Sequence, residues 1–163
     1  MHYCTAYTST MRYASASARS GVVRSLALAA SSLAGATGSA TPFALDAAAA
    51  SIPHPAKAAT GGEDAHFLLD AAYGVFDGVG GWAESGHDPG LFSRALASHT
   101  ARAISRQLAD AATDAPVDLV RALSAGLAEV REIGTTTACL VHVDSVGVLH
   151  ALNVGDAGFR LLR

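Results

Sequence analysis

The sequence predicts an α+β domain in the later part of the chain, behind a long alanine-rich segment. Most of the Leu, Ile, Val and Phe residues that could build a core lie after Phe67. Short apolar runs of strand length stand on either side of two amphipathic helical patterns. Strand runs separated by a helical pair favour an antiparallel sheet over a parallel βαβ architecture. We therefore expect the order strand, strand, helix, helix, strand, strand, strand.

The first two strands are expected at residues 66–69 and 72–76, where apolar runs are bounded by turn residues. The second run ends on residues 77–81 (DGVGG), which are too rich in glycine for regular structure and predict a tight loop.

The first helix is predicted by apolar residues that recur every three or four positions: Leu91, Phe92, Ala95, Leu96, Ile104 and Leu108. Arg94, Arg102 and Arg106 fall on other faces, which we interpret as solvated. A second helix should begin near Pro116, with Asp114 near its cap. Its apolar stripe comprises Val117, Val120, Leu123, Leu127 and Val130.

Three further strands are expected at residues 135–143, 146–154 and 159–162. They are divided by turn residues at 144–145 and 155–158.

The N-terminal part has the composition of a targeting leader. Residues 1–45 contain no Asp or Glu, and arginines are spread among Ser, Thr, Ala and Tyr. Such a segment can form a positive amphipathic helix, as organelle transit peptides do. The alternative is a disordered Ala/Ser tail without an address. Residues 46–60 follow as a linker in which Pro53 and Pro55 should fix an extended path and forbid helix.

Charge and composition exclude several kinds of partner. The net charge is −3 and the pI is about 6.1, so we expect neither nucleic-acid binding nor a polybasic membrane patch. No strongly apolar window is long enough for a stable membrane insertion. Cys4 and Cys139 stand in unlike contexts, so a disulfide framework is not expected, and Cys139 is interpreted as a small buried core residue.

Two segments carry acidic residues that could bind a metal: Glu63 and Asp64 before the first strand, and Asp77 after the second. Magnesium and manganese prefer carboxylate, carbonyl and water ligands. If the two strands form a hairpin, we expect these ends to be separated, and further strands to bring the carboxylates to one edge. The alternative is that Asp77-Gly78 is only a turn.

Five ordered blocks of sequence resemble the organellar branch of the type 2C family of metal-dependent protein serine/threonine phosphatases. They are residues 52–67 (IPHPAK, then TGGEDAHF), 74–83 (GVFDGVGGWA), 88–94 (DPGLFSR), 134–139 (GTTTAC) and 153–159 (NVGDAGF). The resemblance implies two antiparallel β-sheets packed as a sandwich and flanked by helices, an α-β-β-α arrangement. Residues 61–163 would form the N-terminal half of that domain.

By the same resemblance, Asp77 matches the aspartate that bridges two metals, and Gly78 matches the residue whose carbonyl binds one of them. Asp64 matches an acidic residue that reaches a metal through water, with Glu63 beside it. Asp156 matches an aspartate at a further metal position. Two or more divalent cations, magnesium or manganese, are therefore the expected cofactors. A metal-activated water would be the nucleophile, so no catalytic side chain is needed.

The resemblance implies hydrolysis of phosphoserine and phosphothreonine on organelle proteins by a soluble monomer in mitochondria or plastids. Two departures stand out. Val79 occupies a position where many relatives have a histidine suspected of protonating the leaving group. Further metal-binding aspartates are expected well downstream, so a truncated, catalytically inactive fragment that acts through protein interaction is the alternative. An unrelated α+β domain is the third hypothesis.

Overall fold

The computed structural model describes residues 3–6, 45–110 and 115–162. Most of the predicted leader lies outside these residues and stays a prediction. Its described part includes the short strand β1 (Tyr3–Ala6). Within the described ranges, no helix has the length and apolarity needed to cross a membrane.

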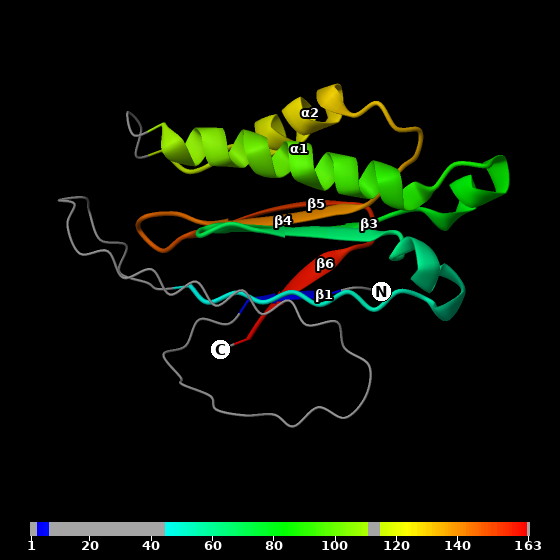
Figure 1. The fold of residues 1–163 in the computed structure, drawn as a ribbon. Coiled ribbons are helices and arrows are strands. Elements are labelled where there is room, and N and C mark those ends of the chain that lie inside the picture. The colour runs from blue at the N-terminus through cyan, green and yellow to red at the C-terminus, as the bar shows by residue number, and fades with distance from the viewer. Residues whose placement is uncertain (1–2, 7–44, 111–114, 163) are drawn as a thin grey trace.

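A four-stranded antiparallel sheet forms the centre of the molecule, with its strands in the order β2-β3-β4-β5. The helices α1 and α2 cover one face of this sheet, and β1 lies with β6 on the other side (Figure 1). The bounds are β2 (Asp64–Leu68), β3 (Ala72–Asp77), α1 (Pro89–Ala109), α2 (Leu119–Glu129), β4 (Ala138–Val143), β5 (Leu149–Val154) and β6 (Gly158–Leu161). This order confirms the predicted succession of strands and helices.

The fold class is confirmed as an α+β arrangement with a helical layer, an antiparallel sheet and a second, small sheet. The second sheet differs from the expectation, because β1 pairs with β6 in parallel. The second helical layer of the expected sandwich is not found among residues 3–6, 45–110 and 115–162.

Two short 3-10 helices were not predicted: η1 (Pro55–Thr60) and η2 (Gly80–Ser85). The prediction that prolines forbid helix in the linker is therefore wrong at Pro55. A proline is tolerated in the first turn of a helix, where no donor is needed. The side chain of His54 accepts a hydrogen bond from the Ala56 amide at 3.2 Å and caps this turn.

The start of α2 corrects the predicted cap near Asp114 and Pro116. Asp118 caps the helix, and its carboxylate accepts a hydrogen bond from the Arg121 amide at 2.9 Å. The side chain of Gln107 on α1 binds both backbone groups of Asp118, at 2.8 Å to the amide and 3.1 Å to the carbonyl. This contact between the two helices favours a start at Leu119, which the sequence pattern could not show.

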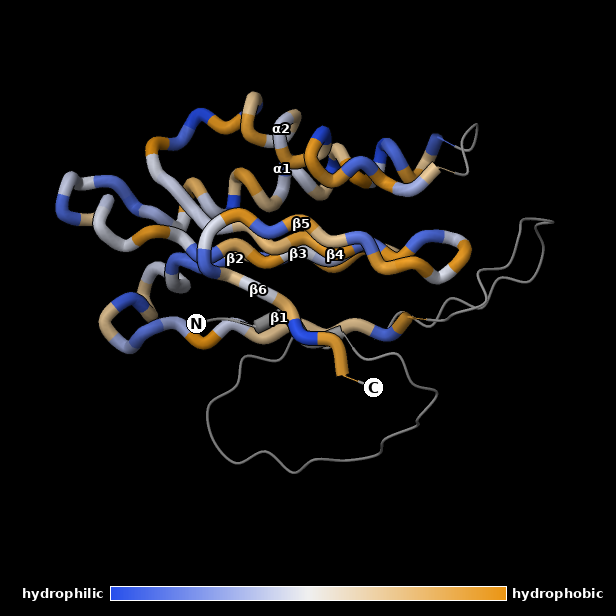
Figure 2. Tube along the Cα trace, turned by 180° about the vertical axis from the view of Figure 1, so that it is seen from behind, coloured by the Kyte–Doolittle hydropathy of each residue, from blue (hydrophilic) through white to orange (hydrophobic). Residues whose placement is uncertain are grey.

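The core lies between the helices and the upper face of the sheet. Figure 2 shows hydrophobic and hydrophilic positions interspersed along the strands and along the helices that cover them. Phe76 and Leu140 from the sheet and Ile104 from α1 are almost completely buried. Burial of each such side chain stabilises the fold by roughly 2 kcal/mol. A Cβ at Gly74 would lie 2.4 Å from the Phe67 ring and 2.8 Å from Leu140, so only glycine fits between them.

The two helices are in close contact at Gly126 of α2. A Cβ at this position would lie 2.6 Å from Oγ1 and 2.8 Å from the amide nitrogen of Thr100 on α1. Thr100 is fully buried, so neither backbone can move away without opening the core.

We expect Gly126→Ala to destabilise the domain by about 1–3 kcal/mol, because overpacking outweighs the gain in helix propensity. The exposed Ser124 on the same helix provides the control, since Ser124→Ala should be neutral or slightly stabilising. Urea unfolding followed by circular dichroism measures both. Equal stability of the two variants would show that the helices are not in tight contact here.

Candidate metal centre

The β2–β3 hairpin itself brings two of the predicted carboxylates together. Asp64 and Asp77 are directly paired across the two strands. Residues paired in this way point to the same face of the sheet, with Cβ atoms about 5 Å apart. The expectation that a hairpin would separate these ends is therefore wrong. In an antiparallel pair, the first residue of one strand lies beside the last residue of the other.

The end of β3 is held firmly against the start of β4. The Asp77 amide donates to the Thr137 hydroxyl at 3.1 Å, and the Thr137 amide donates to the Asp77 carbonyl at 2.9 Å. The Val79 amide donates to the Thr135 carbonyl at 3.0 Å, which completes an isolated bridge between Gly78 and Thr136. These bonds flank Gly78, so its own carbonyl is directed away from β4.

The close approach of Gly78 to the β2 side explains why glycine is required there. Its amide donates to the Glu63 carbonyl at 3.2 Å. A Cβ at Gly78 would lie 2.5 Å from that carbonyl oxygen and 3.1 Å from the Pro89 carbonyl oxygen. The backbone at residue 78 is therefore placed by contacts on both sides, and its carbonyl can serve as a fixed ligand.

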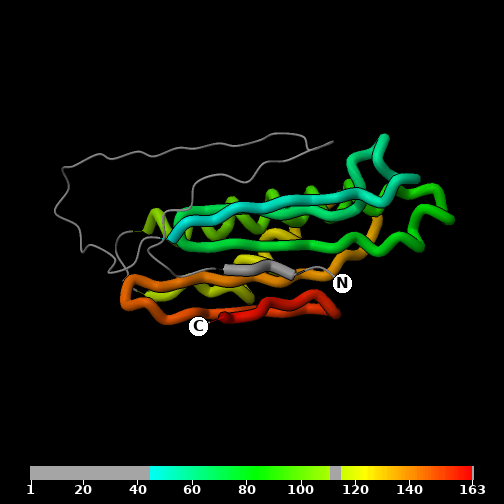
Figure 3. Tube along the Cα trace, turned by 90° about the horizontal axis from the view of Figure 1, so that it is seen from below, coloured from blue at the N-terminus to red at the C-terminus, as the bar shows by residue number. Residues whose placement is uncertain are grey.

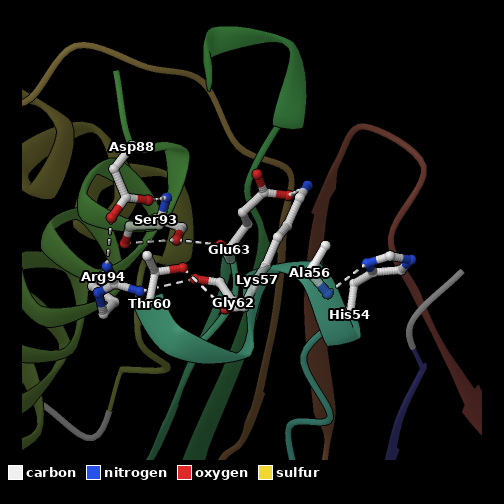
Figure 4. Close-up of polar contacts among 10 residues, drawn as sticks. His54, Ala56, Lys57, Thr60, Gly62, Glu63, Asp88, Ser93 and Arg94 are labelled. Atoms are coloured by element: carbon white, nitrogen blue, oxygen red, sulfur yellow. Dashed lines mark hydrogen bonds and ion pairs between the residues drawn. The ribbon is translucent and has the colours of Figure 1, made fainter. Parts of the chain in front are cut away.

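Glu63 lies beside Asp64 in sequence, but its carboxylate forms an ion pair with Lys57 from η1 (Figure 4). The pair is partly shielded, because the Glu63 side chain is 14% exposed. The structure thus places Glu63 against a cation of the chain rather than with Asp64 and Asp77. Lys57 and the Glu63 carboxylate also limit the space at Gly80, where a Cβ would lie 3.0 Å from Lys57 Nζ.

Asp156 occupies the turn between β5 and β6 and is exposed. This turn reaches the same end of the sheet, because a Cβ at Gly155 would lie 2.9 Å from Thr137 Cγ2. Gly155 also has a φ of 90°, a conformation that favours glycine. The structure therefore brings Asp156 to the same end of the sheet as Asp64 and Asp77 without joining it to that pair.

A cavity of about 150 Å³ lies below the hairpin, on the face away from the helices. Asp64 and Asp77 line it together with Ala157 of the β5–β6 turn. Residues 48–51 close it from below, and Figure 3 shows this segment running alongside the hairpin. The two carboxylates thus face a partly enclosed space rather than open solvent.

The donors at this end fit a hard dication in kind, since carboxylates and carbonyls are the ligands that magnesium and manganese prefer. However, these ligands are too few to complete the coordination shell of a metal ion. Across residues 3–6, 45–110 and 115–162, no three His, Cys, Asp or Glu side chains converge closely enough to hold a metal. Asp64, Asp77 and the Gly78 carbonyl could therefore supply only part of a coordination shell.

Val79 and Cys139 complete the comparison with the sequence prediction, and Trp82 is described beside them. Val79 is 46% exposed beside the site and has no proton to donate. Trp82 is anchored by a hydrogen bond from its Nε1 to the Thr135 hydroxyl at 2.9 Å. Cys139 is 1% exposed, which confirms its interpretation as a core residue.

Sequence reasoning missed the part that α1 plays at the site. The predicted solvated face describes Arg94 only in part, because its side chain is 39% exposed but its Nη1 donates to the Gly62 carbonyl at 3.1 Å. The neighbouring Ser93 donates to the Glu63 carbonyl (Figure 4). The available signal was a serine on the apolar side of an amphipathic helix, where a hydroxyl needs a partner.

Several plant proteins named as probable protein phosphatases are similar in sequence to this chain. Over 114 residues the chain is 48% identical to the Arabidopsis thaliana protein named probable protein phosphatase 2C 80, covering 69% of this chain and 26% of that protein. It is 40% identical over 120 residues to probable protein phosphatase 2C BIPP2C1 of Oryza sativa subsp. japonica, covering 73% and 20%. The chain thus spans about a quarter or less of the length of these relatives.

Among solved structures, the X-ray structure of the photosystem II phosphatase PBCP resembles this fold. Its TM-score is 0.55 at 36% sequence identity, and the match covers 64% of this chain and 40% of that one. No protein-family model matches the chain. The agreement of the curated relatives and the solved structure shows that this chain belongs to the protein phosphatase 2C family, of whose domain it spans a part.

Proposed function

We propose that this chain supplies the metal-binding end of a phosphatase domain that hydrolyses phosphoserine and phosphothreonine on proteins. The register that sets Asp64 opposite Asp77, next to Gly78, is the observation that carries this proposal. It supports the proposal because carboxylates directly opposite each other repel, and a bound cation relieves that repulsion. The named relatives give the reaction class.

Each residue has a distinct role in this proposal. Asp77 is the central ligand by the family resemblance, and hydrogen bonds at its amide and carbonyl to Thr137 fix its backbone. Gly78 offers its carbonyl, Asp64 contributes from the facing strand, and Asp156 contributes from the β5–β6 turn. Glu63 is neutralised by its ion pair with Lys57 and is not a direct ligand in this proposal. When bound, two or more magnesium or manganese ions would neutralise phosphoryl oxygens and activate water for attack on phosphorus.

Val79 cannot donate the proton that the leaving group needs, so another group must donate it. The Val79 side chain is apolar, and its exposure leaves room for solvent beside the site. We propose that water donates this proton, which should make the reaction more dependent on the pKa of the leaving group.

A catalytically inactive fragment is the second candidate function. It is favoured by the incomplete donor set among residues 3–6, 45–110 and 115–162. It is also favoured by exposed apolar side chains at the β5–β6 end, among them Val154, Phe159 and Leu161. Such a surface suits protein interaction more than an isolated enzyme.

For substrates we propose phosphorylated organelle proteins, acted on by a monomer. The name of the similar solved structure links that protein to photosystem II, which favours a plastid over a mitochondrion for this chain. We expect a fluorescent reporter fused to residues 1–60 to enter plastids, because the acid-free, arginine-bearing start suits import receptors. A diffuse cytosolic signal would remove this assignment.

We expect Asp77→Asn to lower phosphopeptide turnover by roughly 100-fold or more, since it removes the charge that holds the cations. Manganese affinity should fall with it, while circular dichroism stays near that of the wild type because the side chains are isosteric. Calorimetry and a phosphopeptide assay measure the two effects in a version of the protein that carries the complete domain.

The matched control is Asp70→Asn, since Asp70 is an exposed residue in the turn at the opposite end of the same hairpin. It should change neither turnover nor manganese binding. If Asp77→Asn behaves like this control, Asp77-Gly78 is only a turn and the metal assignment is withdrawn. If the wild-type complete domain has no activity, the inactive fragment becomes the better account.

A further inference from the structure

The first turns of α1 bind the backbone that precedes Asp64. Ser93 is completely buried, and its Oγ lies 2.5 Å from the Glu63 carbonyl oxygen and 3.1 Å from the Gly90 carbonyl oxygen. A hydroxyl has one hydrogen to donate, and the shorter distance favours Glu63 as the acceptor. A hydroxyl buried on a helix thus binds another segment of the chain.

Arg94 binds the residue just before Glu63. Its Nη1 donates to the Gly62 carbonyl at 3.1 Å, and its Nη2 approaches Asp88 Oδ2 at 3.4 Å (Figure 4). The other oxygen of Asp88 accepts from the Gly90 amide at 2.8 Å and caps α1. A Cβ at Gly90 would lie 2.5 Å from both Arg94 Nη1 and the Gly62 carbonyl oxygen, so glycine is needed for this contact.

The two acidic segments meet at one atom, the carbonyl oxygen of Glu63. It receives the Ser93 hydroxyl from α1 and, at 3.2 Å, the amide of Gly78 from the end of β3. Residues 62 and 63 are therefore fixed from the helix side by Ser93 and Arg94, and from the sheet side by Gly78. Asp64 follows directly, as the first residue of β2 and the partner of Asp77.

We propose that Ser93 and Arg94 are positioning residues that hold Glu63 and Asp64 so that the carboxylates of Asp64 and Asp77 share one metal position. This inference deepens the proposed function and rests on it. Neither side chain touches the metal. They act through the backbone carbonyls of Gly62 and Glu63, as groups outside the ligand shell commonly orient the ligands themselves.

The chain offers a matched control on the same helix. Ser105 and Arg106 repeat the Ser-Arg pair and are both exposed. Ser93→Ala and Arg94→Gln are compared with Ser105→Ala and Arg106→Gln in the 163-residue chain. Arg94 is 39% exposed, so its substitution leaves the core intact and remains informative if Ser93→Ala does not fold.

The first measurement needs no metal. Amide hydrogen exchange, resolved by residue, should become faster at Gly78, whose amide donates to the Glu63 carbonyl, in the Ser93→Ala and Arg94→Gln variants. Exchange in α2 and β5 should stay as in the controls, because the lost bonds are local. Unchanged exchange at the Gly78 amide, or a uniform increase over the whole domain, would overturn the proposal.

The second measurement titrates manganese chloride and follows the paramagnetic signal of free Mn²⁺. Affinity should fall roughly tenfold in Ser93→Ala and Arg94→Gln, as is usual when groups behind a ligand are removed, and should be unchanged in the controls. If exchange changes in Ser93→Ala and Arg94→Gln but their Mn²⁺ affinity equals that of the controls, the role of the two residues in metal binding is overturned. If the wild-type chain binds no Mn²⁺, the proposed metal function fails for this chain, and the exchange data alone decide whether Ser93 and Arg94 position Asp64.

Discussion

The antiparallel pairing of β2 with β3 sets both the core packing and the position of the acidic pair. Its register places Asp64 opposite Asp77 at one end and sets Phe67 beside Gly74 on the helix-facing side. A shift by one residue would turn every β2 side chain to the other face. The same slip would bury Asp64 under α1 and expose Phe67, so core packing and the acidic pair select the same register.

The helical layer contributes to the site as well as to the core. α1 packs on β2 and β3 with its apolar side, while its first turns bind the segment before Asp64. The glycines at 78 and 90 permit close backbone contacts at this junction, where a Cβ would meet carbonyl oxygens at 2.5 Å. Stability and the geometry of the carboxylates are thus linked through one short stretch of chain.

The sequence predicted the order of strands and helices because apolar spacing reflects which face each residue buries. It also marked Asp64, Asp77 and Gly78 through their place beside strand ends. It could not predict the start of α2, which is favoured by the contact of Gln107 with Asp118. Nor could it predict that Glu63 faces Lys57 or that Arg94 binds Gly62, since side-chain partners distant in sequence follow only from the packed fold.

A cation shared by Asp64 and Asp77 can be located by anomalous X-ray diffraction from crystals grown with manganese chloride, because the signal gives the metal position independently of activity. We expect a peak between the two carboxylates, within about 2.5 Å of an oxygen of each, with the Gly78 carbonyl nearby. Manganese bound elsewhere in well-ordered crystals, with both carboxylates visible and without a cation between them, would contradict this expectation.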